Sequence, residues 1–246
     1  MNLLIDIGNS RLKWALDRDG SIDFGAAIAY RQIAFAESLS RQWQHLPKPN
    51  GIAVASVAAK PVLADVLALA ATLWPDVIPM LPQSSAHAFG VENAYQQPTR
   101  LGVDRWLSLI AAHVDYRGNV CVADCGTAIT IDAVAASGQH LGGLICPGMA
   151  TMQSALIANT AALQCDNAVP FPELASATGQ AIANGALMAA VGLIETSVKH
   201  LAARHRLVLT GGDAEIIGSA LNVDAVVDSL LVFKGLAIVC RGEAST

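Results

Sequence analysis

Two stretches of the chain share one pattern of apolar and polar positions. In residues 3–16 an apolar run meets a short polar turn and then resumes with alternating apolar and polar side chains, which is the pattern of a β-hairpin. Residues 120–134 repeat this plan. Aligning Asp124 with Asp6 gives an offset of 118 residues, from position 6 to position 124, which is close to half of the chain. A repeat of that length indicates a duplicated domain rather than a solenoid.

The rest of the first half alternates strand-like and helix-like segments. We expect a strand at 22–30, a helix at 32–45, a strand at 52–57, a helix at 60–73 and a strand at 77–81. The run 52–57 is short and rich in residues that favour strands, which is typical of a parallel strand buried on both faces, and Pro61 favours the first turn of a helix. Strands that lead into helices and back into strands form a parallel α/β layer.

The second half continues in the same way after an irregular segment, 82–101, which leads into a helix beginning in 102–113. Long irregular segments inside compact domains are usually functional. Beyond the link 116–119 and the second hairpin, we expect a strand at 140–149, a helix at 150–163, a loop at 165–178, a helix at 180–205, a strand at 206–209, and helices at 214–221 and 229–241. The sequence thus predicts two domains, 1–115 and 116–246.

The composition is that of a globular protein with a small-molecule partner. Hydrophobic residues make up 53% and charged residues 14% of the chain, and the net charge is −5, so we expect neither nucleic-acid nor membrane binding. Asp6 interrupts the apolar N-terminus, which argues against a signal peptide. The most apolar stretches, 181–198 and 225–240, carry polar and charged residues and are interpreted as core-facing helices. We expect a cytoplasmic protein.

The cysteines and histidines predict neither a disulfide nor a zinc site. The five Cys residues are odd in number and show no metal-binding spacing. Cys121 and Cys125 lie on one predicted strand, roughly 13 Å apart at ~3.3 Å per residue, which is too far for a disulfide. We interpret the cysteines as reduced thiols. None of the six His residues forms a zinc-like pair.

The first hairpin has the chemistry of a phosphate cradle. Asn9, Ser10, the backbone N–H groups of the turn and the ammonium of Lys13 can face one anion, and Asp6 is available for a hard divalent cation. Gly8 allows a close approach of the backbone to a ligand or a positive φ. A purely surface role for Lys13 stays open.

Four further residues are candidates for contact with a ligand, and two of them also have a structural interpretation. Asp104 lies near a helix N-terminus at the mouth of the irregular segment, where it either only caps the helix or also contacts a ligand. Thr178 is either a helix N-cap or a ligand contact. Gly211 and Gly212 follow a strand and precede a helix, which allows a ligand to lie against the backbone.

Four segments in series resemble type III pantothenate kinase, a family of the acetate and sugar kinase/Hsp70/actin superfamily. They are Asp6-Ile7-Gly8-Asn9-Ser10 through Lys13, Gly102-Val103-Asp104-Arg105, Asp124-Cys125-Gly126-Thr127-Ala128 through Asp132, and Thr210-Gly211-Gly212. The resemblance covers essentially the whole chain. It implies an α/β fold of two duplicated ribonuclease H-like domains, the actin-like ATPase fold, with ATP and the active site in the interdomain cleft.

The resemblance also implies how the nucleotide and the cations are bound. The phosphates of ATP would contact Asp6, Ile7, Gly8, Asn9, Ser10, Arg11, Leu12 and Lys13, with Asp6 near Mg2+. Thr127 would contact the nucleotide, and Gly211 and Gly212 lie where the superfamily has its adenosine motif. Asp124 matches the ligand of a monovalent cation, potassium (K+) or ammonium (NH4+).

The substrate implied by the resemblance is pantothenate. The matching positions are Tyr95, Gly102, Val103, Asp104, Arg105 and Thr178. Asp104 would accept the proton of the primary alcohol of pantothenate as that alcohol attacks the γ-phosphate, and Arg105 would steady the carboxylate or a phosphate oxygen. Family members are homodimers with a substrate site shared between subunits, so Thr178 would serve the site of the partner.

The two hairpins are not identical, and two other functions stay open. The offset of 118 sets Thr127 on Asn9 and Ile131 on Lys13, so the hairpins differ in chemistry. A regulatory accessory protein could keep the nucleotide fold without catalysis, although the presence of Asp6, Asp104, Asp124 and Lys13 together argues against it, because a binding protein needs no base. A sugar or acetate kinase of the same superfamily usually needs a longer chain.

Overall fold

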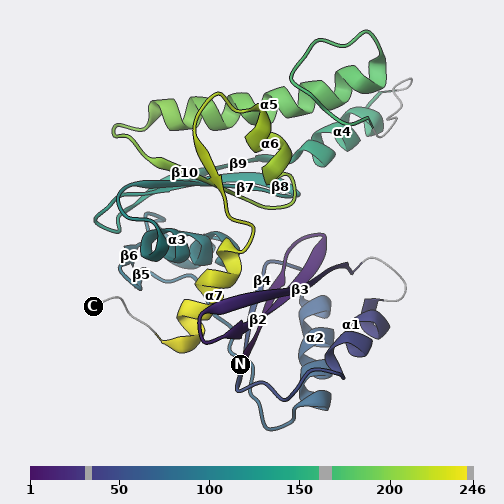
Figure 1. Ribbon diagram of the computed structural model, residues 1–246, viewed down its shortest axis with the longest axis vertical. Helices are drawn as coiled ribbons and strands as arrows, with labels where there is room; N and C mark the ends of the chain where they lie inside the picture. The colour runs from purple at the N-terminus through teal and green to yellow at the C-terminus, as the bar shows by residue number, and fades with distance from the viewer. Residues whose placement is uncertain (31–34, 161–167, 243–246) are drawn as a thin grey trace. The chain divides into compact units, whose positions relative to one another are not determined.

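The computed structural model describes residues 1–30, 35–160 and 168–242 (Figure 1). The chain divides into two compact units. The first combines Met1–Asp115 with the segment that begins at Leu230, and the second is Tyr116–Ser229. The sequence-based division gave all of 116–246 to the second domain, whereas the structure groups the last helix, α7 (Leu231–Arg241), with the first unit.

The first unit is built on a four-stranded sheet of order β3-β2-β1-β4, with helices on both faces. Its strands are β1 (Asn2–Ile7), β2 (Arg11–Arg18), β3 (Ser21–Ala29) and β4 (Gly51–Ser56). Strands β1, β2 and β3 are antiparallel neighbours, and β4 runs parallel to β1. The hairpin of residues 3–16, the third strand and the buried parallel strand predicted from the sequence are thereby confirmed.

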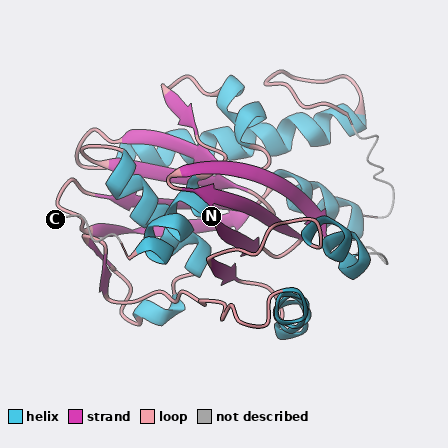
Figure 2. Cartoon of the chain, turned by 60° about the horizontal axis from the view of Figure 1, so that its bottom comes forward, coloured by secondary structure: helices cyan, strands magenta, loops and turns pink. Residues whose placement is uncertain are grey.

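The two faces of β1 are covered by different helices because successive side chains of a strand point to opposite faces. Leu3, Ile5 and Ile7 pack against α1 (Phe35–Trp43) and α2 (Lys60–Leu73). Leu4 packs in a cluster with α7 and α3 (Val103–Asp115). Figure 2 shows the helices in cyan and the strands in magenta. Residues 32–34 of the predicted first helix lie outside the described residues.

The strand predicted at 77–81 is wrong. Only Met80 pairs with the sheet, in a single parallel bridge to Ala53; its N–H donates to the carbonyl of Ile52 at 2.8 Å. Pro79 and Pro82 flank this bridge and have no backbone N–H to donate, so the ladder does not extend. The rest of the irregular segment contains only β5 (His87–Ala88), β6 (Val91–Glu92) and the 3₁₀ turn η1 (Pro98–Arg100).

The second unit repeats the topology of the first. Its strands are β7 (Val120–Cys125), β8 (Ala128–Val134), β9 (His140–Pro147), β10 (Arg206–Thr210) and β11 (Ala225–Val227), and its helices are α4 (Met149–Ala158), α5 (Thr178–His200) and α6 (Ala214–Ala220). The sheet order is β11-β10-β7-β8-β9, with β10 parallel and β8 antiparallel to β7. Each sheet therefore begins with a hairpin, adds a third antiparallel strand at one edge and continues with a parallel strand on the other side. The predicted duplication is visible in the fold.

Three element boundaries in this half differ from the sequence-based expectation. Residues 225–227, expected within a core-facing helix, form β11, whose Val226 and Val227 favour a strand and which pairs with β10. Helix α5 ends at His200, whereas the sequence predicts an end at 205. The prediction is too long because 201–204 contains no Gly or Pro that would signal the stop. Helix α4 ends at Ala158, and 161–163 lie outside the described residues.

Helix α5 is long and apolar enough to cross a membrane by length and composition alone. One of its faces, however, packs on the second sheet through Leu187, Val191 and Ile194, which are buried with Cys121 and Leu207. We therefore interpret α5 as a core helix of the second unit, as the sequence predicts.

Helix α7 is fixed to the first unit by a close helix crossing and a buried ion pair. A Cβ atom added to Gly235 would lie 2.2 Å from the carbonyl oxygen of Leu107 on α3, so only glycine allows the two helices to approach this closely. At the end of α7, Arg241 binds Asp17, which is 1% exposed, through Nη1 contacts of 2.9 and 3.0 Å.

Gly235→Ala is expected to lower the free energy of unfolding by about 1–3 kcal/mol, because the added methyl group forces α3 and α7 apart. Urea unfolding measures this change. Gly192→Ala in α5 is the matched control: a Cβ there meets nothing within 4 Å, and alanine favours the helix by up to about 1 kcal/mol. Equal stability of the two variants would contradict the close crossing.

Candidate active site

The turn between β1 and β2 is held by two hydrogen bonds to Gly8, and this glycine has room for a Cβ atom. The N–H of Gly8 donates to the carbonyl of Arg11 at 3.1 Å, and the Tyr30 hydroxyl donates to the carbonyl of Gly8 at 2.9 Å. Gly8 does not have a positive φ, so that option is not used. A Cβ there would meet only the Arg11 carbonyl, at an ordinary 3.5 Å. Among the described residues no contact requires glycine at this position, so the backbone there has room for the close approach of a ligand.

Asp6 and Lys13 lie directly opposite each other on β1 and β2. They share a sheet face with the neighbouring cross-strand pair Leu4 and Ala15, because residues two apart on a strand point the same way. Leu4 and Ala15 pack in the cluster that contains α3 and α7. Asp6, 7% exposed, and the half-buried Lys13 are thus on the α3 side of the first sheet. This position does not favour a purely surface role for Lys13.

Asp104 lies in the first turn of α3. Its Oδ1 accepts a hydrogen bond from the backbone N–H of Arg105 at 2.8 Å, so the carboxylate binds an N–H group of the first turn from inside the helix and not from the N-cap position. A Cβ on Gly102 would lie 2.6 Å from this same oxygen. Gly102 therefore makes room for the carboxylate of Asp104 at the helix start.

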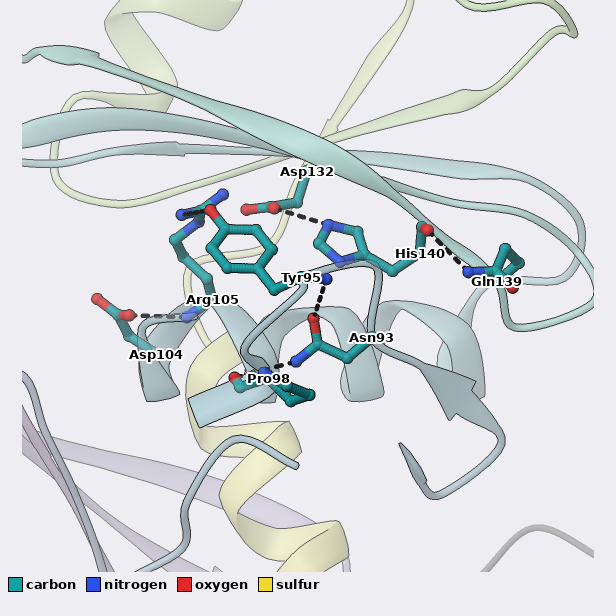
Figure 3. A network of polar contacts seen from close by, with 8 residues as sticks. All are labelled: Asn93, Tyr95, Pro98, Asp104, Arg105, Asp132, Gln139 and His140. Atoms are coloured by element: carbon teal, nitrogen blue, oxygen red, sulfur yellow. Dashed lines mark hydrogen bonds and ion pairs between the residues drawn. The ribbon is translucent and has the colours of Figure 1, made fainter. Parts of the chain in front are cut away.

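Arg105 and Tyr95 form a partly buried pair beside Asp104 (Figure 3). The guanidinium of Arg105 donates to the Tyr95 hydroxyl at 2.9 Å and lies 5.6 Å from the centre of its ring. Arg105 is only 7% exposed. A buried guanidinium held by a phenol is suited to bind a carboxylate. Sequence reasoning missed Asn93, which binds the backbone of Tyr95; its only signal is an Asn two residues before the aromatic residue.

The turn between β7 and β8 repeats the bond of the first turn with one residue fewer. The N–H of Gly126 donates to the carbonyl of Ala128 at 3.1 Å. As a result, Asp124 faces Thr130 across the hairpin, as Asp6 faces Lys13. The counterpart of Lys13 is therefore Thr130, and the expected pairing with Ile131 is wrong. The offset of 118 residues holds up to the turn but not beyond it.

Asp124, on β7, has small and polar neighbours on the strands β8 and β10 and in the turn that follows β10. Thr130 and Thr210 lie abreast of it on β8 and β10. Gly211 has a φ of +93°, and a Cβ there would lie 2.5 Å from Asp124 Oδ1 and 2.6 Å from the carbonyl oxygen of Cys125. Position 211 therefore requires glycine, both because of its positive φ and because a Cβ atom has no room there. The structure thus brings together Asp124 and Gly211, which the sequence assigned to different motifs.

The start of α4 supports the turn that carries Thr127. The carbonyl of Thr127 accepts hydrogen bonds from the Gly148 N–H at 2.9 Å and the Thr151 hydroxyl at 2.7 Å. A Cβ on Gly148 would lie 2.0 Å from the carbonyl oxygen of Gly126. Sequence reasoning missed these contacts, because a Gly before a helix is common and its distant partner is not visible in the pattern.

Thr178 is the first residue of α5 and is exposed. The N-cap is Ala177, without a side-chain cap bond, so the N-cap interpretation of Thr178 is wrong. The loop before it is fixed by Asn184, whose amide donates to the carbonyl of Glu173 at 2.7 Å and accepts from the N–H of Phe171 at 3.0 Å.

The chain matches the family model of type III pantothenate kinase over residues 2–200. A type III pantothenate kinase from Nitrosococcus oceani is 39% identical over 252 residues, with 98% of this chain and 94% of the relative covered. One from Burkholderia mallei is 37% identical over 262 residues, with 98% and 99% covered. The chain belongs to the type III pantothenate kinase family. The predicted family is therefore confirmed.

Solved structures support the fold of this pantothenate kinase family member. A Baf family transcriptional activator from Campylobacter jejuni has a TM-score of 0.62 at 24% identity, with 98% of both chains covered. A 2-dehydro-3-deoxygalactonokinase from Sinorhizobium meliloti has a TM-score of 0.59 at 15% identity, with 98% and 99% covered. At these identities the likeness concerns the fold alone. The fold class predicted from the sequence, the two-domain actin-like ATPase fold, is confirmed.

The kinase contains two buried thiols, Cys121 and Cys125, on the strand β7 that also carries Asp124. Burial, and secondarily the carboxylate of Asp132, raises the pKa of the Cys121 thiol from 9.0 to about 12. Burial, followed by the carboxylates of Asp124 and Asp213, raises the pKa of Cys125 to the same value. Cys121, Cys125, Cys146 and Cys240 are free thiols, and Cys165 lies outside the described residues. Within the described ranges no group of three or more His, Cys, Asp or Glu is placed to hold a metal ion.

Cys121 and Cys125 are expected to resist alkylation in the folded kinase at about pH 8, because the thiolate is the reactive form. Peptide mass spectrometry after iodoacetamide treatment measures this, with the partly exposed Cys146 as the internal control. A raised thiol pKa stabilises the fold below the unfolded value near 9, and this contribution is lost as the pH rises towards about 12. Native Cys121 that reacts as fast as Cys146 would contradict the prediction.

Proposed function

We propose that this chain transfers the γ-phosphoryl group of ATP to pantothenate, giving 4′-phosphopantothenate in the first step of coenzyme A biosynthesis, with Asp104 as general base. The observation that carries the reaction is the 39% identity over nearly the full length to a type III pantothenate kinase. The position of Asp104, at the start of the helix that covers the Asp6 face of the first sheet, supports its role.

The first hairpin is proposed to bind the phosphates of ATP through residues 6–13. The bare backbone at Gly8 and the ammonium of Lys13 suit an anion. Asp6 fits a magnesium site, because Mg2+ is usually held by one or two carboxylates together with substrate phosphates and needs no larger protein cluster. When bound, the ion would neutralise the charge that develops on the transferred group.

We assign both the acceptance of the proton and the binding of pantothenate to residues at the start of α3. Phosphoryl transfer depends on positioning and charge more than on covalent catalysis. Asp104 accepts the proton of the primary alcohol as its oxygen attacks phosphorus. The buried guanidinium of Arg105, held by Tyr95, binds the pantothenate carboxylate, and the backbone at Gly102 and Val103 lies against the substrate.

The second unit is proposed to supply the monovalent cation and the adenosine contacts. Asp124 with Thr130 and Thr210 alongside offers the oxygen donors that potassium or ammonium would require. Thr127 contacts the nucleotide, and the backbone at Gly211 and Gly212 lies against the adenosine. A Cβ at Gly212 would meet no described atom within 4 Å, so the backbone there is open, which supports this use of the strand end.

The kinase is proposed to act in the cytoplasm as a homodimer in which Thr178 serves the partner's site. The apolar side chains Leu141, Leu144 and Ile145 on the edge strand β9 are 51%, 49% and 66% exposed. Leu174, in the loop before Thr178, is fully exposed. Exposed apolar side chains on an edge strand and in the loop before α5 support burial against a second copy.

Asp104→Asn is expected to lower kcat by about 10²–10⁴-fold while ATP binding persists, because the amide cannot accept the proton. Coupled measurement of ADP release with pantothenate, alongside sugar and acetate acceptors, gives the rate and the substrate class. Asp115→Asn, at the other end of α3, removes a carboxylate paired with Lys234 at 3.2 Å and should keep the activity. Near-normal turnover by Asp104→Asn would count against this base.

Replacing potassium by sodium is expected to reduce activity by about fivefold or more, a typical size for coupling between two bound ligands. Asp124→Asn should give low activity that no longer responds to potassium. Titration of potassium into both proteins measures the effect. Indifference of the unaltered enzyme to potassium would remove the role given to Asp124.

A further inference from the structure

Asn93 is a buried asparagine whose side-chain amide and backbone N–H bind backbone atoms of the segment that carries Tyr95. It is 9% exposed. Its backbone N–H donates to the Ala86 carbonyl at 2.9 Å. Its side-chain Nδ2 donates to the carbonyls of Ser85 at 3.1 Å and Pro98 at 3.2 Å, and its Oδ1 accepts from the N–H of Tyr95 at 3.0 Å (Figure 3).

These bonds replace the regular structure that residues 82–101 lack. The segment contains two two-residue strands and one 3₁₀ turn, so no long helix or strand orients Tyr95. The side chain of Asn93 instead joins three points of the segment, at 85, 95 and 98. The hydroxyl of Tyr95 in turn accepts the hydrogen bond of Arg105. A continuous chain of contacts thus runs from Asn93 to the guanidinium.

We propose that Asn93 is a positioning residue of the pantothenate site: it holds Tyr95 where its hydroxyl fixes the guanidinium of Arg105 for the substrate carboxylate. The proposal rests on the proposed function of Tyr95 and Arg105. Asn93 itself does not contact the substrate. Its loss should therefore weaken pantothenate binding through Arg105 and leave ATP binding to the first hairpin unchanged.

The chemistry of the site favours an amide over every residue of similar size. The two donor bonds need an NH2 group, and the bond from Tyr95 needs an oxygen. Asp has the same shape but would turn an oxygen towards the carbonyls of Ser85 and Pro98. Leu would leave both carbonyls and the Tyr95 N–H without their partner, which is costly for buried groups.

Asn93→Asp and Asn93→Ser are the test variants. Each should raise the KM for pantothenate about tenfold or more, the size expected for a lost buried hydrogen bond, with the KM for ATP within about twofold of the unaltered enzyme. Serine keeps a short polar side chain if aspartate prevents folding. Steady-state kinetics, well below the melting temperature of each variant, gives both constants.

Asn119→Ala is the matched control, because Asn119 makes bonds of the same kind in the second unit. Its Nδ2 donates to the Arg204 carbonyl at 3.3 Å and its Oδ1 accepts from the Ala136 N–H at 2.9 Å. This variant should lower the melting temperature and leave the KM for pantothenate unchanged. Equal changes in both KM values for the Asn93 variants would indicate a general loss of structure and overturn the proposal.

Tyr95→Phe distinguishes the role proposed for Asn93 from the role proposed for Tyr95. If Tyr95→Phe raises the KM for pantothenate and the Asn93 variants do not, the role of Asn93 is wrong while that of Tyr95 stands. If Tyr95→Phe has no effect, the proposed function of Tyr95 fails, and with it the route from Asn93 to the substrate. In the Tyr95→Phe background, Asn93→Ser should raise the KM for pantothenate little further, because both changes break one chain of contacts; additive effects would contradict this.

Discussion

The alternation of side chains along a β-strand decides on which face of each sheet Asp6 and Asp124 lie. On β1 the odd-numbered residues Leu3, Ile5 and Ile7 fill the core under α1 and α2, so Asp6 must point to the face covered by α3 and α7. On β7 the same rule sends Cys121, Ala123 and Cys125 into the core under α5 and α6 and leaves Asp124 on the opposite face. A shift of either strand by one residue would bury the carboxylate in a hydrocarbon core.

This constraint explains why the hairpins could be predicted from the sequence and much of their surroundings could not. A period of two residues and a polar turn are local signals, and both hairpins follow them. The bridge at Met80 and the strand β11 depend on pairing with distant strands. The end of α5 has no stop signal. The difference between Ile131 and Thr130 as the counterpart of Lys13 depends on one turn residue, which only the register of the hairpins reveals.

The site residues divide in the same way. Asp6, Asp104 and Asp124 were found because each follows a recognisable pattern at a strand end or helix start. Asn93 and Gly148 were missed because they act on the backbone of residues that the pattern does not connect to them. Gly102 and Gly211 were expected to give a ligand access, whereas the structure shows that each first makes room for a neighbouring carboxylate. Local sequence thus predicts the candidate carboxylates better than the residues that hold them in place.

The return of α7 to the first unit has a consequence for the order of folding during synthesis. The ribosome releases residues 1–115 before 116–229, but the face of the first sheet with Leu4 and Ala55 packs against Phe233 and Leu236 of α7, which emerge after residue 229. The second unit is continuous in sequence, from 116 to 229, and can close before them. The half that begins the chain is therefore the last to be completed, and until then its nascent apolar face is a target for chaperones.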